Sequence, residues 1–177
     1  MNICVFCGSS SGLNPIYADA ARELGSLLAT QQHTLVYGGG NVGLMGIVAD
    51  AALEKKGRVI GVIPDFLMQK EVGHKGLTEL EIVPSMHERK KRMADLSNAF
   101  IAMPGGWGTL EELAEILTWK QLGLIQQSVG ILNVNGFFDT LLQQMNLMVK
   151  EGFLNPNKLK TVKVSNSPNQ LLSMLIP

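Results

Sequence analysis

The sequence predicts a single α/β domain, a Rossmann-like, doubly wound parallel sheet flanked by helices, that spans residues 1–177. Short apolar runs typical of buried parallel strands alternate along the chain with longer segments of helical periodicity. Loops rich in glycine or serine follow three of these strands. A length of 177 residues and an apolar content of 46% suit one domain with a full core.

The elements follow from these patterns in order. Strands are expected over residues 3–6, 34–37, 58–63, 80–83, 99–103, 129–134 and 161–164. Helices are expected over 15–32, 44–56, 85–96, 109–119, 137–150 and 168–175. Asn14 and Thr109 are the expected N-caps of their helices, Ser85 is expected to start the charged helix, and Gly57 is the expected C′ residue of the second helix. The irregular segment 65–78 is expected to form a loop or a lid.

Charge and hydropathy exclude several classes of protein. Fifteen basic and fifteen acidic residues give no net charge, so no nucleic-acid partner is expected. The chain has no 18-residue apolar stretch for a membrane span and no signal-peptide pattern at its start, so a cytoplasmic location is expected. Cys4 and Cys7 should lie on opposite faces of a strand, roughly 10 Å apart, and remain buried free thiols.

The segment Ser97–Trp119 predicts a phosphate site. An apolar strand, 99–103, ends at Pro104, and Gly105, Gly106 and Gly108 form a turn before the next helix. Free N–H groups and the positive end of the helix dipole meet there. The loops 8–12 and 38–43 also follow strands, so all three loops should share one edge of the sheet. A phosphorylated ligand is therefore expected.

The glycine pattern of the second loop leaves another ligand open. Gly38-x-Gly40-x-x-Gly43 matches the dinucleotide fingerprint, and Asp65 stands where a ribose-binding acid is expected. An NAD(P)-dependent oxidoreductase is thus an alternative. The same glycines also suit a tight turn with close helix–strand packing.

Two charged residues are candidates for chemistry. Glu112 completes a T-x-x-E capping box with Thr109, yet it would also lie beside a bound phosphate, as an acid/base residue does. From these residues alone, cap and catalyst are equally consistent. Arg89 shares a helix face with Met93, and a partly buried arginine would bind an anion and orient it. Trp107, inside the glycine turn, could stack on a base or simply pack.

The motif Pro104-Gly105-Gly106-Trp107-Gly108-Thr109-Leu110-Glu111-Glu112, together with Met86-His87-Glu88-Arg89-Lys90, resembles the LONELY GUY family. The family signature P-G-G-x-G-T-x-x-E is matched at every fixed position. Cys7-Gly8-Ser9-Ser10, Tyr37-Gly38-Gly39-Gly40 and Gly43-Leu44-Met45-Gly46 extend the likeness. Members of this family are cytokinin riboside 5′-monophosphate phosphoribohydrolases, once widely mislabelled lysine decarboxylases.

The resemblance implies cleavage of the N-glycosidic bond of an adenine-type 5′-nucleotide, with Arg89 and Glu112 as the catalytic pair. It implies a homodimer with the site near the subunit interface, and neither a metal nor an organic cofactor. The loops and the resemblance together give the expected substrate-binding residues: Gly8, Ser9, Gly39, Gly43, Glu71, Arg89, Lys90, Gly105, Gly106, Trp107, Gly108, Thr109, Leu110, Glu111, Glu112 and Thr118. A non-catalytic carrier, similar to molybdenum cofactor carriers, is a further alternative.

Overall fold

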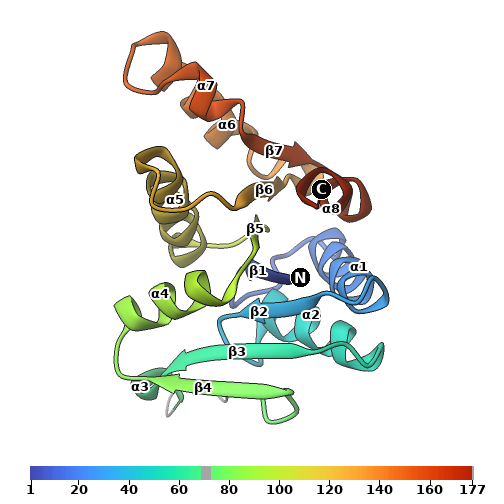
Figure 1. Ribbon diagram of the computed structural model, residues 1–177. Coiled ribbons are helices and arrows are strands. Elements are labelled where there is room, and N and C mark those ends of the chain that lie inside the picture. The colour runs from blue at the N-terminus through green and yellow to red at the C-terminus, as the bar shows by residue number, and fades with distance from the viewer. Residues whose placement is uncertain (69–72, 177) are drawn as a thin grey trace.

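The computed structural model describes residues 1–68 and 73–176 and has a seven-stranded sheet in the order β4-β3-β2-β1-β5-β6-β7 (Figure 1). Every neighbouring pair of strands is parallel. The strands are β1 (Asn2–Phe6), β2 (Thr34–Tyr37), β3 (Val59–Pro64), β4 (Glu79–Val83), β5 (Ala99–Ala102), β6 (Ser128–Leu132) and β7 (Val162–Ser165). The predicted fold class is confirmed.

The central strands are apolar because the sheet buries them on both faces. β1 lies between β2 and β5, with Cys4 opposite Val36 on one side and Phe100 on the other. The chain adds β2, β3 and β4 outward from β1, then returns to the other side of β1 with β5. The strand order therefore reverses between β1 and β5, which is where open α/β sheets bind ligands.

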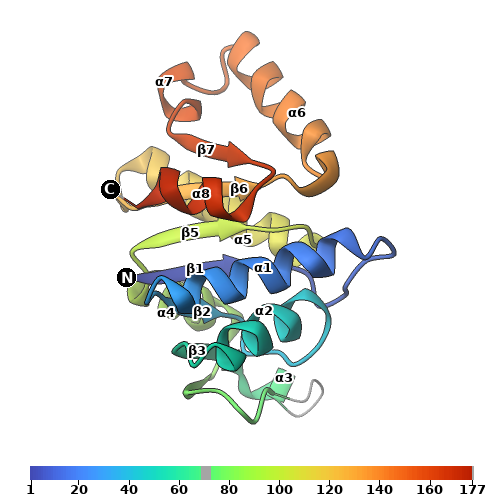
Figure 2. The same ribbon diagram turned by 90° about the vertical axis from the view of Figure 1, so that its right-hand side faces the viewer.

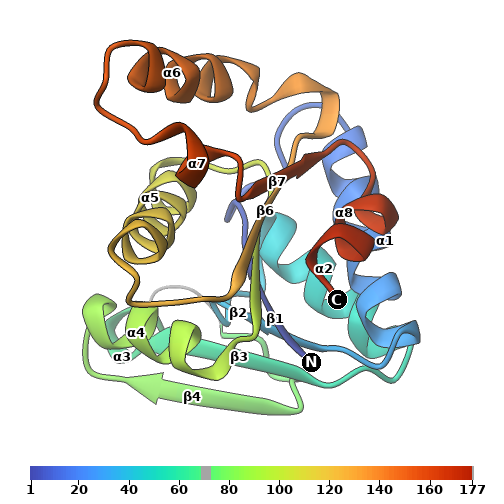
Figure 3. The same ribbon diagram turned by 45° about the horizontal axis from the view of Figure 1, so that its top comes forward.

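Helices cover both faces of the sheet (Figures 2 and 3). On one face lie α1 (Ile16–Thr30), α2 (Gly43–Glu54) and α8 (Pro168–Leu175), which close one apolar core with the strands. On the other lie α4 (Met86–Leu96), α5 (Trp107–Leu122) and α6 (Asp139–Lys150), which close a second core. Short helical segments, α3 (Asp65–Met68), η1 (Val134–Gly136) and α7 (Pro156–Leu159), complete the order.

Several element ends agree with the sequence patterns. Ser85 caps α4, because its side chain accepts a hydrogen bond from the N–H of Glu88 at 3.2 Å. The expected N-cap Asn14 was wrong: α1 begins at Ile16 with Pro15 as its N-cap residue, although the side chain of Asn14 accepts from the N–H of Ile16 at 3.1 Å. Cys4 and Cys7 are free and buried in the two opposite cores, as expected.

Other expected ends were wrong. Thr109 is not an N-cap: α5 begins at Trp107, with Gly106 as the N-cap residue. The left-handed residue after α2 is Lys56, with φ 59°, rather than Gly57, whose missing side chain instead makes room for Ala29 of α1. The strand expected over 129–134 ends at Leu132, because η1 begins at Val134. The short helices α3, in the segment expected to be a loop, and α7 were not predicted.

Part of segment 65–78 is tied to the glycine loop after β2. Gly73 forms a β-bridge with Gly40, and the N–H of His74 donates to the carbonyl of Gly39 at 3.1 Å. The buried His74 ring also forms a hydrogen bond with Asp50 of α2 at 2.8 Å.

Within the described residues, no helix is long and apolar enough to span a membrane.

Candidate active site

Three loops meet at the carboxyl ends of β1, β2 and β5, as predicted. The N–H of Gly8 donates to the carbonyl of Pro104 at 3.1 Å, and the N–H of Met45 donates to the carbonyl of Gly8 at 3.3 Å. A Cβ on Gly43 would lie 2.3 Å from the backbone of Ser9, so only glycine allows this approach. The loops thus surround one cavity of about 210 Å³.

Arg89 of α4 enters this cavity from the side of β3. Its Nε donates to the carbonyl of Val62 at 3.1 Å, and its Nη2 donates to the carbonyl of Gly38 at 3.2 Å. These two carbonyls, one within β3 and one just after β2, hold the guanidinium plane in one orientation. A Cβ on Gly38 would lie 1.8 Å from Nη2, so Arg89 occupies space that only a glycine leaves open.

Glu112 of α5 faces Arg89 across the cavity. Its Oε1 lies 3.6 Å from Nη1 of Arg89, and only 7% of the residue is exposed. Burial raises the pKa of Glu112 to about 7, although the charges of Arg89 and Lys90 act in the opposite direction. A carboxyl group with a pKa near neutrality can exchange a proton or carry a charge at physiological pH.

The prediction that Glu112 caps the helix was wrong. Because α5 begins at Trp107, Glu112 lies in the second turn, beyond the reach of the N-cap. The Glu112 side chain therefore does not bond the free N–H groups at the start of α5, and capping does not explain why it is buried against Arg89. Its catalytic role stays a prediction.

The start of α5 lines the cavity floor with backbone N–H groups. Gly106, Trp107, Gly108 and Thr109 occupy the N-cap and the first three helical positions, where N–H groups have no partner within the helix. Neither Gly106 nor Gly108 has an atom within 4 Å of an added Cβ, so the approach to this backbone is open. This arrangement suits a phosphate group.

Lys90, the neighbour of Arg89, is buried and turned toward α5. Its Nζ donates to Glu111 at 2.6 Å and to Glu115 at 3.3 Å. Burial lowers the pKa of Lys90, but the two carboxylates outweigh this effect and leave it raised. Lys90 is therefore charged and held between two acids.

The structure brings together about half of the predicted binding residues. Those that line the cavity are Gly8, Ser9, Arg89, Gly106, Trp107, Gly108, Thr109 and Glu112. Those outside the described lining are Gly39, Gly43, Lys90, Gly105, Leu110, Glu111 and Thr118. Glu71 lies outside the described residues.

Some lining residues were absent from the predicted set: Val5, Cys7, Gly38, Met45 and Leu67. Gly38 carried a signal, because it opens the glycine run after β2. No feature of the sequence marks Met45 and Leu67 as site residues, because apolar residues on helices are expected to lie in the core. Burial raises the pKa of the Cys7 thiol well above its usual range, so Cys7 is neutral in the cavity wall.

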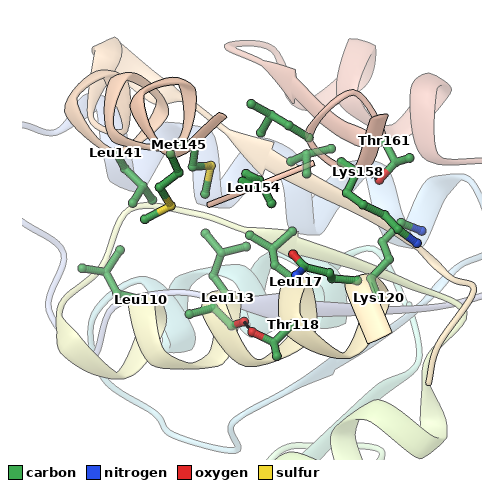
Figure 4. Close-up of a pocket in the computed structure, with 15 residues that line it drawn as sticks. Leu110, Leu113, Leu117, Thr118, Lys120, Leu141, Met145, Leu154, Lys158 and Thr161 are labelled. Carbon is green, nitrogen blue, oxygen red and sulfur yellow. Dashed lines mark hydrogen bonds between the residues drawn. The ribbon is translucent and has the colours of Figure 1, made fainter. Parts of the chain in front are cut away.

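A second hollow lies between α5 and α6 (Figure 4). We call it the α5–α6 groove, and its volume is about 370 Å³. Leu110, Leu113 and Leu117 of α5 face Leu141 and Met145 of α6 across it. Thr118 lines the same groove, and Lys120 and Lys158 lie at one end.

Comparison with known proteins identifies the family. A family model described as "Possible lysine decarboxylase" matches residues 45–175. A cytokinin riboside 5′-monophosphate phosphoribohydrolase of Arabidopsis thaliana is 47% identical over 98% of this chain and 81% of its own. A probable enzyme of the same name from Oryza sativa is 47% identical over 98% of this chain and 71% of its own. The chain belongs to the LONELY GUY family.

Solved structures resemble this LONELY GUY chain in fold. A molybdenum cofactor binding protein of Rippkaea orientalis has a TM-score of 0.72 at 23% identity, over 98% of this chain and 93% of its own. The molybdenum cofactor carrier protein of Chlamydomonas reinhardtii has a TM-score of 0.70 at 22% identity, over 98% of both chains. These likenesses show the fold alone, so they add nothing to the carrier interpretation.

The dinucleotide interpretation also loses its support. Gly38 leaves space for the guanidinium of Arg89, and Gly43 packs against Ser9. Both glycines thus have packing reasons within the fold. The fingerprint reflects close contact between loops.

Proposed function

We propose that this enzyme hydrolyses the N-glycosidic bond of adenine-type nucleoside 5′-monophosphates, releasing the free base and ribose 5-phosphate. The observation that supports it best is the Arg89–Glu112 pair, buried beside the open N-terminus of α5 in one cavity. A phosphate site and an adjacent carboxyl group of raised pKa are what this reaction needs.

The 5′-phosphate would bind the N–H groups of Gly106, Gly108 and Thr109. Cleavage of the C1′–N9 bond sends its electron pair to the base and leaves positive charge on the ribose, as in glycoside hydrolysis. The Glu112 carboxylate would stabilise that charge and take a proton from the water that attacks C1′, and the departing base would take up a proton from solvent. Water is the only co-reactant, so this chemistry uses no cofactor.

Arg89 would bind and orient the substrate. Two of its nitrogens are bonded to main-chain carbonyls, which leaves Nη1 directed toward Glu112 and the cavity. An arginine stays protonated at neutral pH, so it cannot supply the proton to the leaving base. Its fixed charge can hold sugar or phosphate oxygens and keep the reacting bond near Glu112.

We further propose a cytokinin nucleotide or AMP as substrate. The names of the relatives specify cytokinin riboside 5′-monophosphate. Trp107, 88% exposed at the mouth of the cavity, offers an aromatic surface for a base, and Leu67 offers an apolar one. The family resemblance implies tyrosine in many plant members where this chain has Trp107, so the preferred base substituent is left to the assay below.

A product assay tests the function directly. The purified protein is incubated with AMP and, separately, with N6-isopentenyladenosine 5′-monophosphate, and free base is measured by chromatography. Release of base from either supports the proposal, and the ratio of rates gives the preference. If folded protein releases no base from either, the hydrolase proposal fails, and binding of molybdenum cofactor or NAD(P)H is tested next.

We also propose that the enzyme acts as a homodimer whose interface includes the α5–α6 groove. Thr118 follows Thr109 by nine residues on α5, roughly 13 Å along the helix. It lies in the groove, away from the cavity of its own chain. If Thr118 contacts substrate, as the family resemblance implies, it does so in the site of a second copy.

A further inference from the structure

The two helices that carry the proposed catalytic pair are joined by a second set of charges. Arg89 and Lys90 are consecutive on α4, and Glu111 and Glu112 are consecutive on α5. Arg89 faces Glu112 at 3.6 Å, and Lys90 bonds Glu111 at 2.6 Å. The buried Lys90 contact thus stands directly beside the Arg89–Glu112 contact on both helices.

We propose that Lys90 is a positioning residue, which bridges Glu111 and Glu115 and thereby fixes α4 against α5 so that Arg89 stands at its working distance from Glu112. This inference rests on the proposed function for its catalytic meaning. It assigns Lys90 a different role from the substrate contact that the family resemblance implies.

The environment of Lys90 supports a structural bridge. Its ammonium group does not line the described cavity, and two of its three donors are occupied by carboxylates of α5. Glu111 and Glu115 are four residues apart on one helix, where like charges repel. The positive charge of Lys90 offsets that repulsion, so both carboxylates can lie on the same side of α5.

Both helices pack on the same apolar core, which includes Met93 of α4 and Leu113 of α5. Farther along them, a surface hollow is lined by Ala94 and Asp95 of α4 and by Trp119 of α5. The ion pairs of Lys90 join α4 to α5 at the end of this contact that lies next to Arg89 and Glu112. A displacement of about 1 Å between catalytic groups can lower a rate about a hundredfold.

The same cluster also acts on Glu112 through its charges. The charged groups that face Glu112 are Arg89 and Lys90 from α4 and Glu111 and Glu115 from α5 itself. The thiols of Cys4 and Cys7, from β1 and the loop after it, face Glu112 as well, and burial keeps them neutral. Lys90 favours the Glu112 carboxylate, whereas Glu111 and Glu115 oppose it.

The test uses Lys90→Met, which keeps the apolar stem and removes the charge, and Glu111→Gln. Steady-state kcat and KM are measured with AMP or the isopentenyl nucleotide across pH. We expect Lys90→Met to lower kcat about tenfold or more while KM changes little. The acid limb of its kcat/KM profile should move to higher pH. The limb of Glu111→Gln should move to lower pH, because an opposing charge is gone.

Lys91→Met is the matched control, because Lys91 is the next lysine of α4 and is exposed beside Asp95. It should leave kcat, KM and the acid limb unchanged. Lys90→Arg, which keeps a cation at the bridge, should retain more activity than Lys90→Met and guards against loss of folding. A rise in KM with kcat and acid limb unchanged in Lys90→Met would overturn the inference and make Lys90 a substrate contact.

An activity-independent readout separates this inference from the proposed function. The Glu112 carboxyl is titrated by ¹³C NMR without substrate, with Glu112→Gln to assign its signal. Its pKa should be higher in Lys90→Met and lower in Glu111→Gln than in the wild-type protein. Unchanged titrations with an active wild-type enzyme reject the inference alone. Shifted titrations with an inactive wild-type enzyme reject the proposed function alone.

Discussion

At the scale of single residues, the site holds a pair of charges that are not equally satisfied. Arg89 has carbonyl partners at 3.1 and 3.2 Å, so main-chain oxygens within β3 and just after β2 stabilise its charge. Glu112 has Arg89 at 3.6 Å, which is long for a hydrogen bond, and burial leaves its pKa raised. A carboxylate held in an unfavourable environment is typical of a group kept for chemistry.

The first prediction concerns Glu112→Gln, which should lower kcat by at least about a hundredfold. It should also stabilise the fold above pH 7. A pKa raised from 4.5 to about 7 means that the folded state loses stability as the pH rises through that range. The neutral amide avoids this loss, which amounts to about 3 kcal/mol at pH 8. Thermal unfolding at pH 8 and pH 4 measures the difference.

At pH 4, where the carboxyl is mostly protonated in both states, Glu112→Gln and the wild-type protein should unfold at nearly the same temperature. Glu23→Gln, an exposed change on α1, serves as the control and should alter neither the activity nor the unfolding temperature at pH 8. A variant that is less stable at both pH values and still turns over substrate would return Glu112 to a purely structural role.

The second prediction concerns Gly38→Ala. The added methyl group would occupy the position of Nη2 of Arg89, so the guanidinium must leave its two carbonyl partners. Loss of that orientation should lower kcat/KM by about a hundredfold. The kinetics are compared with thermal unfolding, and a folded variant of normal activity would show that Arg89 does not need this orientation.

At the scale of elements, the strands were predictable and the start of α5 was not. The central strands are buried on both faces, and such strands consist almost entirely of apolar residues, which makes them recognisable in the sequence. At α5, Thr109 and Glu112 have the spacing of a capping box. Thr109 is instead buried at the third helical position, with its hydroxyl beside Gly105. The helix therefore starts earlier than its side-chain pattern indicates.

The same limit applies to the candidate site. Arg89, Glu112 and the glycine turn were predictable because their types and order carry the chemistry. The bridge of Lys90 to Glu111 and Glu115 was not, because it joins residues 21 and 25 positions apart. Met45 and Leu67 enter the cavity wall only when separate elements come together. Such contacts depend on tertiary structure, which local patterns do not encode.

The third prediction belongs to the start of α5 and concerns Gly108→Ala. An added Cβ meets nothing within 4 Å, and alanine favours a helix more than glycine does, so the fold should be equally or more stable. A phosphate bound to this backbone would meet the new methyl group, and KM should rise about tenfold. Unchanged KM for the nucleotide would show that phosphate binds elsewhere.

At the scale of the whole molecule, the two hollows have opposite characters. The cavity at the carboxyl edge of the sheet holds Arg89 and Glu112, whereas the α5–α6 groove is lined mainly by leucine and methionine side chains. α5 forms part of both, because its N-terminus lines the cavity and its middle lines the groove (Figure 4). A contact between copies along α5 would therefore bring one groove near the other site.

The last prediction tests this coupling with Ala114→Glu. Ala114 is exposed in the groove, so a glutamate there disturbs no core and places a charge on an apolar surface. In a two-fold interface each change appears twice, and burying such charges costs several kcal/mol. Sedimentation should show the wild-type protein at twice the 19.2 kDa chain mass and the variant as a monomer.

Activity then shows whether the second copy completes the site. Ser173→Glu is the matched control, because it adds the same charge on exposed α8 across the sheet and should remain dimeric and active. If Thr118 of one copy serves the site of the other, monomeric Ala114→Glu should lose activity, and Thr118→Val should lose activity while it stays dimeric. A monomeric Ala114→Glu with full activity would mean that each chain holds a complete site, and that the groove serves assembly alone.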